Sequence, residues 1–317
     1  MSKKSRLAIL SLALAGLVGV SAATSACTVK TKHPRVKISI SFLEETYDVE
    51  YTLYRNMYPQ TVQHFIELAD GGFYDNTIIH DYKNNDWLGG AYSYNAVVTS
   101  GDNEIQTDYS AAYTSGSLAE YLENNCKEAA YYDMFEAGKF TPSVFKRTVY
   151  NDKGDPEVDS ADALATLIGE FSENDHKIES GALSASYGAL KMMYYEKGDS
   201  NQKVTIKNSF GELLEHDYRY NCATSVFTMQ MGNSTSYSAT KYCVFGELRN
   251  DSAKKALQSL TDAIADYVDT ISKFTTTVDT KVDTLDRFAE DDGRDIEKQF
   301  TLTSVPLIVK TVEVTKY

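Results

Sequence analysis

The sequence predicts a mainly β fold with helices, and three observations support that prediction. Residues 36–41 (VKISIS) alternate apolar and polar side chains, as a half-buried strand does, and residues 47–54 (YDVEYTLY) follow as a second strand. The short segment between them predicts a hairpin. Hydrophobic residues make up 42% of the 317-residue chain, which is ample for a buried core.

A helix is predicted directly after this hairpin. Pro59 stands in its first turn, where the missing N–H donor has no energetic cost. Apolar residues then recur on one helical face at the spacing i, i+3, i+4 and i+7: Val62, Phe65, Ile66 and Ala69. Gly71-Gly72 ends the helix, and residues 77–80 are the next predicted strand, which ends in His80.

The first 26 residues have the pattern of a secretory signal peptide. Lys3, Lys4 and Arg6 are basic, residues 7–20 are apolar, and small residues lead to Ala26. The fourteen residues of the apolar segment fall short of the roughly 20 that a spanning helix needs. We therefore expect an exported protein.

Thr24-Ser25-Ala26-Cys27 resembles a bacterial lipobox, in which the cysteine is acylated and becomes the first mature residue. Acylation of Cys27 would leave residues 27–34 as a tether and hold the protein on the outer face of the bacterial cell membrane. The alternative is plain cleavage after Ala26, which would give a secreted protein with an ordinary thiol at Cys27.

The charge of the chain excludes some partners. Removal of the signal peptide takes away three positive charges, so the net charge goes from −14 to −17. A body this acidic argues against nucleic acid as a partner and against passive adhesion to anionic lipid.

Three cysteines remain beyond Cys27. Export permits disulfides, and Cys222 and Cys243 lie in two successive predicted strands, so they are the expected pair if one forms, with Cys126 left over. The CxxC and HxxxH spacings of metal sites do not occur in the sequence, and the five histidines are scattered. We predict neither a metal nor a cofactor.

Residues 58–90 (YPQTVQHFIELADGGFYDNTIIHDYKNNDWLGG) resemble the first signature of the cyclophilin-type peptidyl-prolyl isomerases. Four further segments follow in the family's order: residues 168–186 (IGEFSENDHKIESGALSAS), 223–229 (ATSVFTM), 242–246 (YCVFG) and 305–314 (VPLIVKTVEV). The resemblance implies a closed eight-stranded antiparallel barrel, capped by helices, over residues 35–317. It also implies proline-containing peptides or exported proteins as partners.

The resemblance further implies where a site would lie. In the family an arginine follows the signature histidine and hydrogen-bonds the prolyl nitrogen, and a glutamine helps to hold the substrate. Asp81 and Ser225 stand at those two catalytic positions. An ionised aspartate cannot donate a hydrogen bond. The implied groove residues are His80, Trp87, Ser186, Tyr187, Phe227 and Tyr242.

Three of these residues also have a structural interpretation. Burial in a core strand accounts for Phe227 as well as a proline pocket does. His80, at a strand end, is interpreted as a framework residue, and Asp81 as a solvated one within the polar stretch DYKNND. Trp87 follows in the same polar stretch, which favours a groove or interface.

Two functions therefore stay open. One is an exported peptidyl-prolyl cis-trans isomerase that assists protein folding outside the membrane, with activity weakened or lost. The alternative is a non-catalytic module that binds peptides or proteins on the same scaffold.

Three features lie outside the family pattern. Residues 92–167, with a helix over 117–136, and residues 190–220 are predicted insertions. Apolar residues spaced by three or four from Leu257 to Phe288 predict a long helix over about 251–290. Either this helix breaks near 275–277 and folds back on the inserted helix, or it forms a coiled-coil seam for a partner or a second copy.

Overall fold

The computed structural model describes the greater part of the chain. The described residues are 31–94, 118–124, 134, 139, 149–151, 153–157, 167–171, 176, 183–192, 203–207, 210–217, 222–223, 225–232, 243–283 and 295–317.

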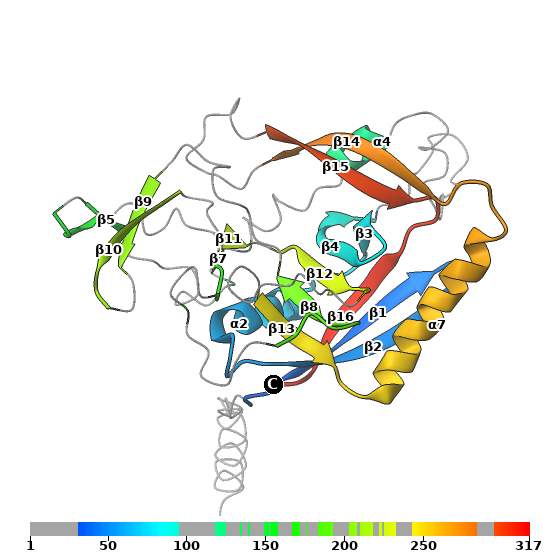
Figure 1. Ribbon diagram of the computed structural model, residues 1–317, viewed down its shortest axis with the longest axis horizontal. Helices are drawn as coiled ribbons and strands as arrows, with labels where there is room; N and C mark the ends of the chain where they lie inside the picture. The colour runs from blue at the N-terminus through cyan, green and yellow to red at the C-terminus, as the bar shows by residue number, and fades with distance from the viewer. Residues whose placement is uncertain are drawn as a thin grey trace, which may run out of the picture.

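Eight strands close into an antiparallel barrel (Figure 1), which confirms the predicted fold class. In spatial order they are β1 (Arg35–Phe42), β16 (Ile308–Lys316), β3 (Thr77–Tyr82), β4 (Asp86–Ser93), β12 (Phe227–Gln230), β8 (Leu190–Met192), β13 (Cys243–Leu248) and β2 (Glu45–Leu53). The first and last barrel strands of the chain, β1 and β16, are neighbours.

The barrel interior is apolar because the strands alternate between inward and outward side chains. On β1 the inward residues Val36, Ile38, Ile40 and Phe42 are fully or almost fully buried. Helix α2 (Pro59–Asp70) packs its apolar face against the same core. Phe65 of α2 contacts Phe227 and Phe245, with ring centroids 5.7 and 5.1 Å away.

Helix α2 begins and ends where the sequence predicts, but its N-terminal cap comes from a distant residue. Glu170 accepts hydrogen bonds from the backbone N–H groups of Gln60 (3.1 Å) and Thr61 (2.8 Å). These donors have no partner within a helix, so a carboxylate there satisfies them. Burial raises the pKa of Glu170, and the backbone hydrogen bonds oppose that rise.

The prediction of one long helix over 251–290 is wrong beyond Val268. Helix α7 (Asp251–Val268) is capped by Asn250, whose side chain accepts from the Ala253 N–H at 3.0 Å. Its apolar face packs on β2, so this face is used within the molecule. The chain then turns and forms β14 (Thr275–Asp283), which pairs with β15 (Asp295–Thr303). The β-branched run Thr275-Thr276-Thr277-Val278 favours a strand.

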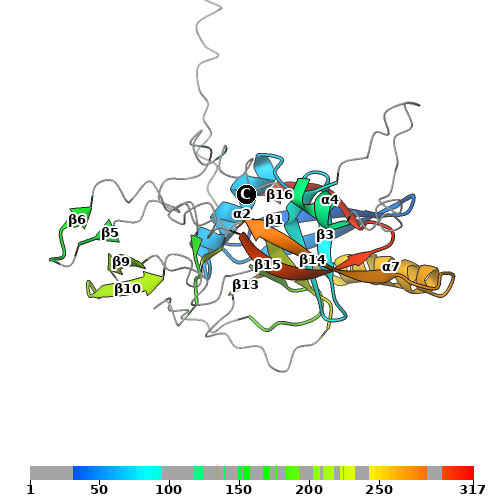
Figure 2. The ribbon, with the colours of Figure 1, turned by 90° about the horizontal axis from the view of Figure 1, so that it is seen from above.

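The interpretation in which the chain folds back after α7 is closer to the structure. β14 packs against α4 (Leu118–Asn124), which is the described start of the predicted inserted helix. Figures 1 and 2 both show the β14–β15 hairpin lying over β3, with α4 beside it.

The predicted insertion over 190–220 begins too early, because Leu190–Met192 is barrel strand β8. The tripeptide Gly-Ala-Leu occurs twice, at 181–183 and 188–190. The family-like segment predicted from the sequence, residues 168–186, contains the first copy, whereas β8 begins in the second. Further along, β9 (Lys203–Lys207) pairs with β10 (Leu213–Asp217). This hairpin lies beside the small β5–β6 hairpin (Val149–Tyr150, Pro156–Glu157), to one side of the barrel (Figure 2).

Two further short strands pair with each other: β7 (Leu167–Ile168) and β11 (Cys222–Ala223). Cys243 is buried, with its Sγ 3.8 Å from Thr61 Oγ1. The side chain of Cys222 lies outside the described residues, so the predicted cysteine pair stays a prediction.

Among the helices that the structure describes, none is long and apolar enough to cross a membrane.

Candidate functional site

Asp81, at the position of the family arginine, is a buried framework residue. The interpretation of its side chain as solvated is therefore wrong. Asp81 lies on β3 with 2% of its surface exposed. Its Oδ1 accepts from the backbone N–H of Thr301 on β15 at 3.0 Å, and its Oδ2 lies 2.5 Å from Lys83 Nζ. Asp81 therefore connects the barrel to the β14–β15 hairpin.

His80 is buried beside Asp81, under the same hairpin. Its ring contacts Tyr92 and Phe300, with centroids 4.9 and 5.2 Å away. Burial lowers the pKa of His80 from 6.5 to about 3, and the charge of Lys83 adds to this effect, while a backbone hydrogen bond with Ile78 opposes it. The imidazole is neutral at physiological pH, as a framework residue in an apolar layer should be.

Ser225, at the position of the family glutamine, is also part of the framework. It is 6% exposed, and its Oγ donates to the Gly90 carbonyl at 2.7 Å. The Tyr74 hydroxyl donates to the Ser225 carbonyl at 3.0 Å. Gly90 has φ +90°, and a Cβ there would lie 2.6 Å from the Ser225 carbonyl oxygen, so the close approach requires glycine.

The structure places two of the predicted groove residues in the barrel interior. Phe227 has no exposed surface and packs against Phe65 and Tyr74. Trp87 lies on β4, is 2% exposed, and stacks on Tyr82 at 5.2 Å. The polar stretch at Trp87 runs into a strand, and both side chains are buried, so their role toward a peptide stays a prediction.

Two of the remaining predicted site residues lie in one loop. Ser186 and Tyr187 precede β8 in a loop, and Ser186 is exposed. Burial raises the pKa of Tyr187, and a hydrogen bond with the Thr261 side chain of α7 partly offsets that rise. Tyr242 and Cys27 lie outside the described residues, so their roles stay predictions.

From Asp81 toward β12 and β8 the outer face of the barrel is mostly polar, whereas toward the hairpin it is apolar. Strand register places Asp81 of β3, Leu88 of β4, Thr228 of β12 and Lys191 of β8 in one row, which we call the outer row. Among these four residues none is aromatic. A proline ring needs an apolar surface, and the outer row offers only the Leu88 side chain for it.

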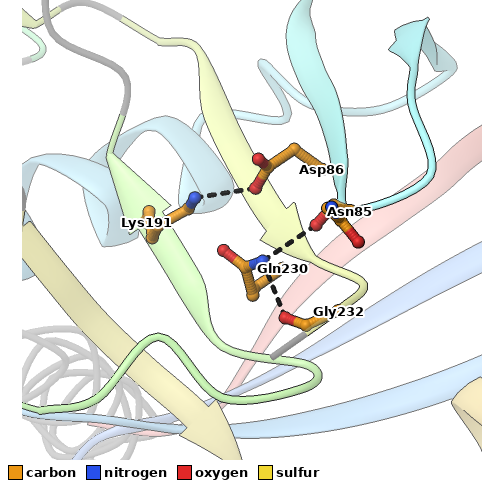
Figure 3. A network of polar contacts seen from close by, with 5 residues as sticks. All are labelled: Asn85, Asp86, Lys191, Gln230 and Gly232. Carbon is orange, nitrogen blue, oxygen red and sulfur yellow. Dashed lines mark hydrogen bonds and ion pairs between the residues drawn. The ribbon is translucent and has the colours of Figure 1, made fainter. Parts of the chain in front are cut away.

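An ion pair crosses the outer face of β12. Lys191 Nζ lies 2.7 Å from Asp86 Oδ1, although β12 separates their strands (Figure 3). Beside it Gln230, which is 1% exposed, donates through Nε2 to the carbonyls of Asn85 (3.0 Å) and Gly232 (2.7 Å). These residues close the surface between β4 and β8.

Sequence reasoning missed Lys191, Asp86 and Gln230. The one available signal was the alternation of each short strand, in which Leu190 and Met192 flank Lys191 with buried side chains. Chemically, the face places a carboxylate acceptor at Asp81 and pairs each nearby lysine, Lys83 and Lys191, with an acid.

Comparison with known proteins identifies relatives of the chain. The family model described as "Cyclophilin type peptidyl-prolyl cis-trans isomerase/CLD" matches residues 36–282, from β1 to β14. Among solved structures, a cyclophilin type peptidyl-prolyl cis-trans isomerase of Cryptosporidium parvum is similar at 14% identity, covering 90% of this chain and 99% of that chain with a TM-score of 0.37. Cyclophilin AquaCyp293 from Hirschia baltica is 12% identical, with coverages of 90% and 75% and a TM-score of 0.33. No curated protein matches the chain.

Proposed function

This chain belongs to the cyclophilin-type peptidyl-prolyl cis-trans isomerase family, and from that premise we propose that it is an exported protein that binds peptide or protein partners and has weak or no isomerase activity. The observation that supports the loss of activity is the buried Asp81 carboxylate at the arginine position, bonded to Thr301 and Lys83.

The chemistry of isomerisation explains why this residue is decisive. Rotation of an X–Pro amide has a barrier of about 18–20 kcal/mol, which a donor to the prolyl nitrogen lowers. A carboxylate is an acceptor, and it opposes the lone pair that develops on that nitrogen. The two oxygens of Asp81 are moreover already occupied, by a backbone N–H and a lysine.

The second candidate function is an active isomerase that assists the folding of exported proteins. The family match favours it, because the matched family is named for this activity. An active isomerase would need a donor and an apolar proline pocket on a face other than the outer row.

A protease-coupled assay on a proline tetrapeptide separates the two candidates. We expect the full chain to give the uncatalysed rate, with an active cyclophilin as the positive control. A rate constant that rises in proportion to the concentration of the chain would overturn the proposal and favour the isomerase.

Export and acylation are further parts of the proposal. The basic, apolar and small-residue segments of residues 1–26 and the lipobox-like Thr24–Cys27 support them. Mass spectrometry of the mature N-terminus is the test. A diacylglycerol adduct on Cys27 is the expected result, an unmodified Cys27 at the N-terminus would indicate the secreted alternative, and an intact Met1 would overturn export.

A further inference from the structure

We propose that the β14–β15 hairpin occupies a strand-binding surface on β3 and β4, and that an extended partner segment with an aromatic, a non-proline and an aliphatic residue in succession can take its place. The inference rests on the binding activity in the proposed function and names the surface and the class of partner. It does not depend on whether any isomerase activity remains.

The hairpin contacts the barrel but belongs to a different sheet. Among the described strands, β14 and β15 pair with each other alone, in their own two-stranded sheet, whereas β3 pairs with β16 and β4. The barrel ladder therefore does not depend on the hairpin. A two-stranded hairpin is at best marginally stable alone, so its contacts with the barrel and α4 determine where it lies.

Apolar contacts hold one face of β15 against the barrel. Phe300 and Leu302 are two residues apart, so they point to the same side of the strand. Leu302 is fully buried in a cluster that includes Ile78 and Tyr92, and Phe300 packs against His80 and Tyr92. This surface accepts one aromatic and one aliphatic side chain.

A polar contact holds the residue between them, Thr301. The Thr301 N–H donates to the buried Asp81 Oδ1 at 3.0 Å. Asp81 thus requires a backbone N–H from the strand that lies over it. Proline has no N–H, so proline is excluded at this position. Asp81, at the position of the family arginine, therefore disfavours proline in the strand that binds over it.

The base of the hairpin is closed and anchored. Ser304 N–H donates to the Phe274 carbonyl at 2.7 Å, so the two ends of the hairpin are adjacent. Phe274 packs against Phe42 and Tyr82 of the barrel, and the Leu307 carbonyl accepts from Ile79 N–H at 2.9 Å. The hairpin can therefore be removed without moving the strands that flank it.

The first experiment replaces residues 275–303 by Gly-Gly and supplies β15 in trans. The probe is a fluorescein-labelled peptide with the sequence of residues 295–303, DIEKQFTLT. We expect saturable binding by fluorescence anisotropy to the hairpin-less variant, and binding at least about tenfold weaker to the full chain, whose surface is occupied. Circular dichroism and the emission of Trp87, the only tryptophan, check that the barrel is folded.

Peptide variants test the specificity. Thr301→Pro in the peptide should weaken binding by about tenfold or more, because the Asp81 oxygen is left without its donor. Thr301→Val, which keeps the N–H, is the matched control and should bind like the parent peptide. Equal binding of the proline and valine peptides, or no binding of the parent peptide to a folded variant, would overturn the proposal.

The second experiment keeps the chain complete, in case the hairpin-less variant does not fold. Asp81→Ala should increase hydrogen exchange in residues 275–283 and 295–303 by about tenfold and leave α7 unchanged. Asp86→Ala, which also breaks a lysine pair but lies away from Thr301, is the control, since the described ion pair of Asp86 is with Lys191 of β8. Unchanged exchange in the hairpin would overturn the proposal. Isomerase activity in the earlier assay would instead contradict the proposed function alone.

Discussion

The inside and the outside of this barrel differ in how far they keep the family pattern. Inside, Phe65 of helix α2 packs against Phe227 and Phe245, and the three rings form an aromatic core. Outside, the arginine position holds an acid that is covered by a hairpin, and an ion pair crosses β12. The interior determines whether the chain folds as a cyclophilin, whereas the outer face is where we propose that partners bind. The two can therefore change independently.

The largest effect should come from the interior. Phe227→Ala removes a fully buried ring from contact with Phe65 and Tyr74. We expect a loss of about 3–5 kcal/mol in the free energy of unfolding, measured by urea denaturation. A loss below about 1 kcal/mol would mean that Phe227 contributes little to the core. It would contradict the claim that the aromatic interior determines folding.

The free energy of unfolding should depend on pH through His80, which lies between the barrel and the hairpin. Its pKa is lowered to about 3 in the folded state and returns to 6.5 on unfolding, so the unfolded chain gains the proton first. This contribution to stability is complete above pH 6.5 and falls as the pH decreases toward 3. At about 1.4 kcal/mol per pH unit, about 3 kcal/mol is lost between pH 6.5 and 4.

The matched variants for this effect are His80→Phe and, at an exposed histidine, His33→Phe. Urea unfolding at several pH values should show a flatter profile for His80→Phe and the wild-type profile for His33→Phe. Parallel profiles for all three proteins would show that His80 is not the group responsible.

A third effect concerns the attempt to restore the family site. Asp81→Arg combined with Ser225→Gln puts both family side chains back, but the hairpin covers the first position and the Ser225 Oγ bond to Gly90 is lost. We expect no gain in isomerase rate and a loss of about 1–3 kcal/mol in stability. A clear gain in the protease-coupled assay would show that the outer face still supports catalysis.

The smallest effect should come from the ion pair on the outer face. Lys191 and Asp86 side chains are 15% and 37% exposed. Their coupling in a double-mutant cycle of Lys191→Met and Asp86→Ala should be below about 1 kcal/mol, since partly solvated pairs contribute little. A coupling of several kcal/mol would give the outer face a share in stability that we assign to the interior.

The sequence predicted elements whose signals are local. Pro59, the apolar face of the next helix and Gly71-Gly72 lie within fourteen residues of one another. The β14–β15 hairpin was missed because Val278 and Val282, four residues apart, share a face in a helix and in a strand alike. The burial of Asp81 was missed for another reason: its partner Thr301 is 220 residues away, and nothing near Asp81 indicates it.

The pairing of β1 with β16 has a consequence for how the protein is made. β16 is the last element of the chain, and it completes the barrel between β1 and β3. The barrel therefore cannot close until β16 has been synthesised. At ~5–20 residues per second, the nascent chain stays open for roughly 15–60 s. Until then β1 and β3 each have one strand edge without its barrel partner, to which chaperones have access.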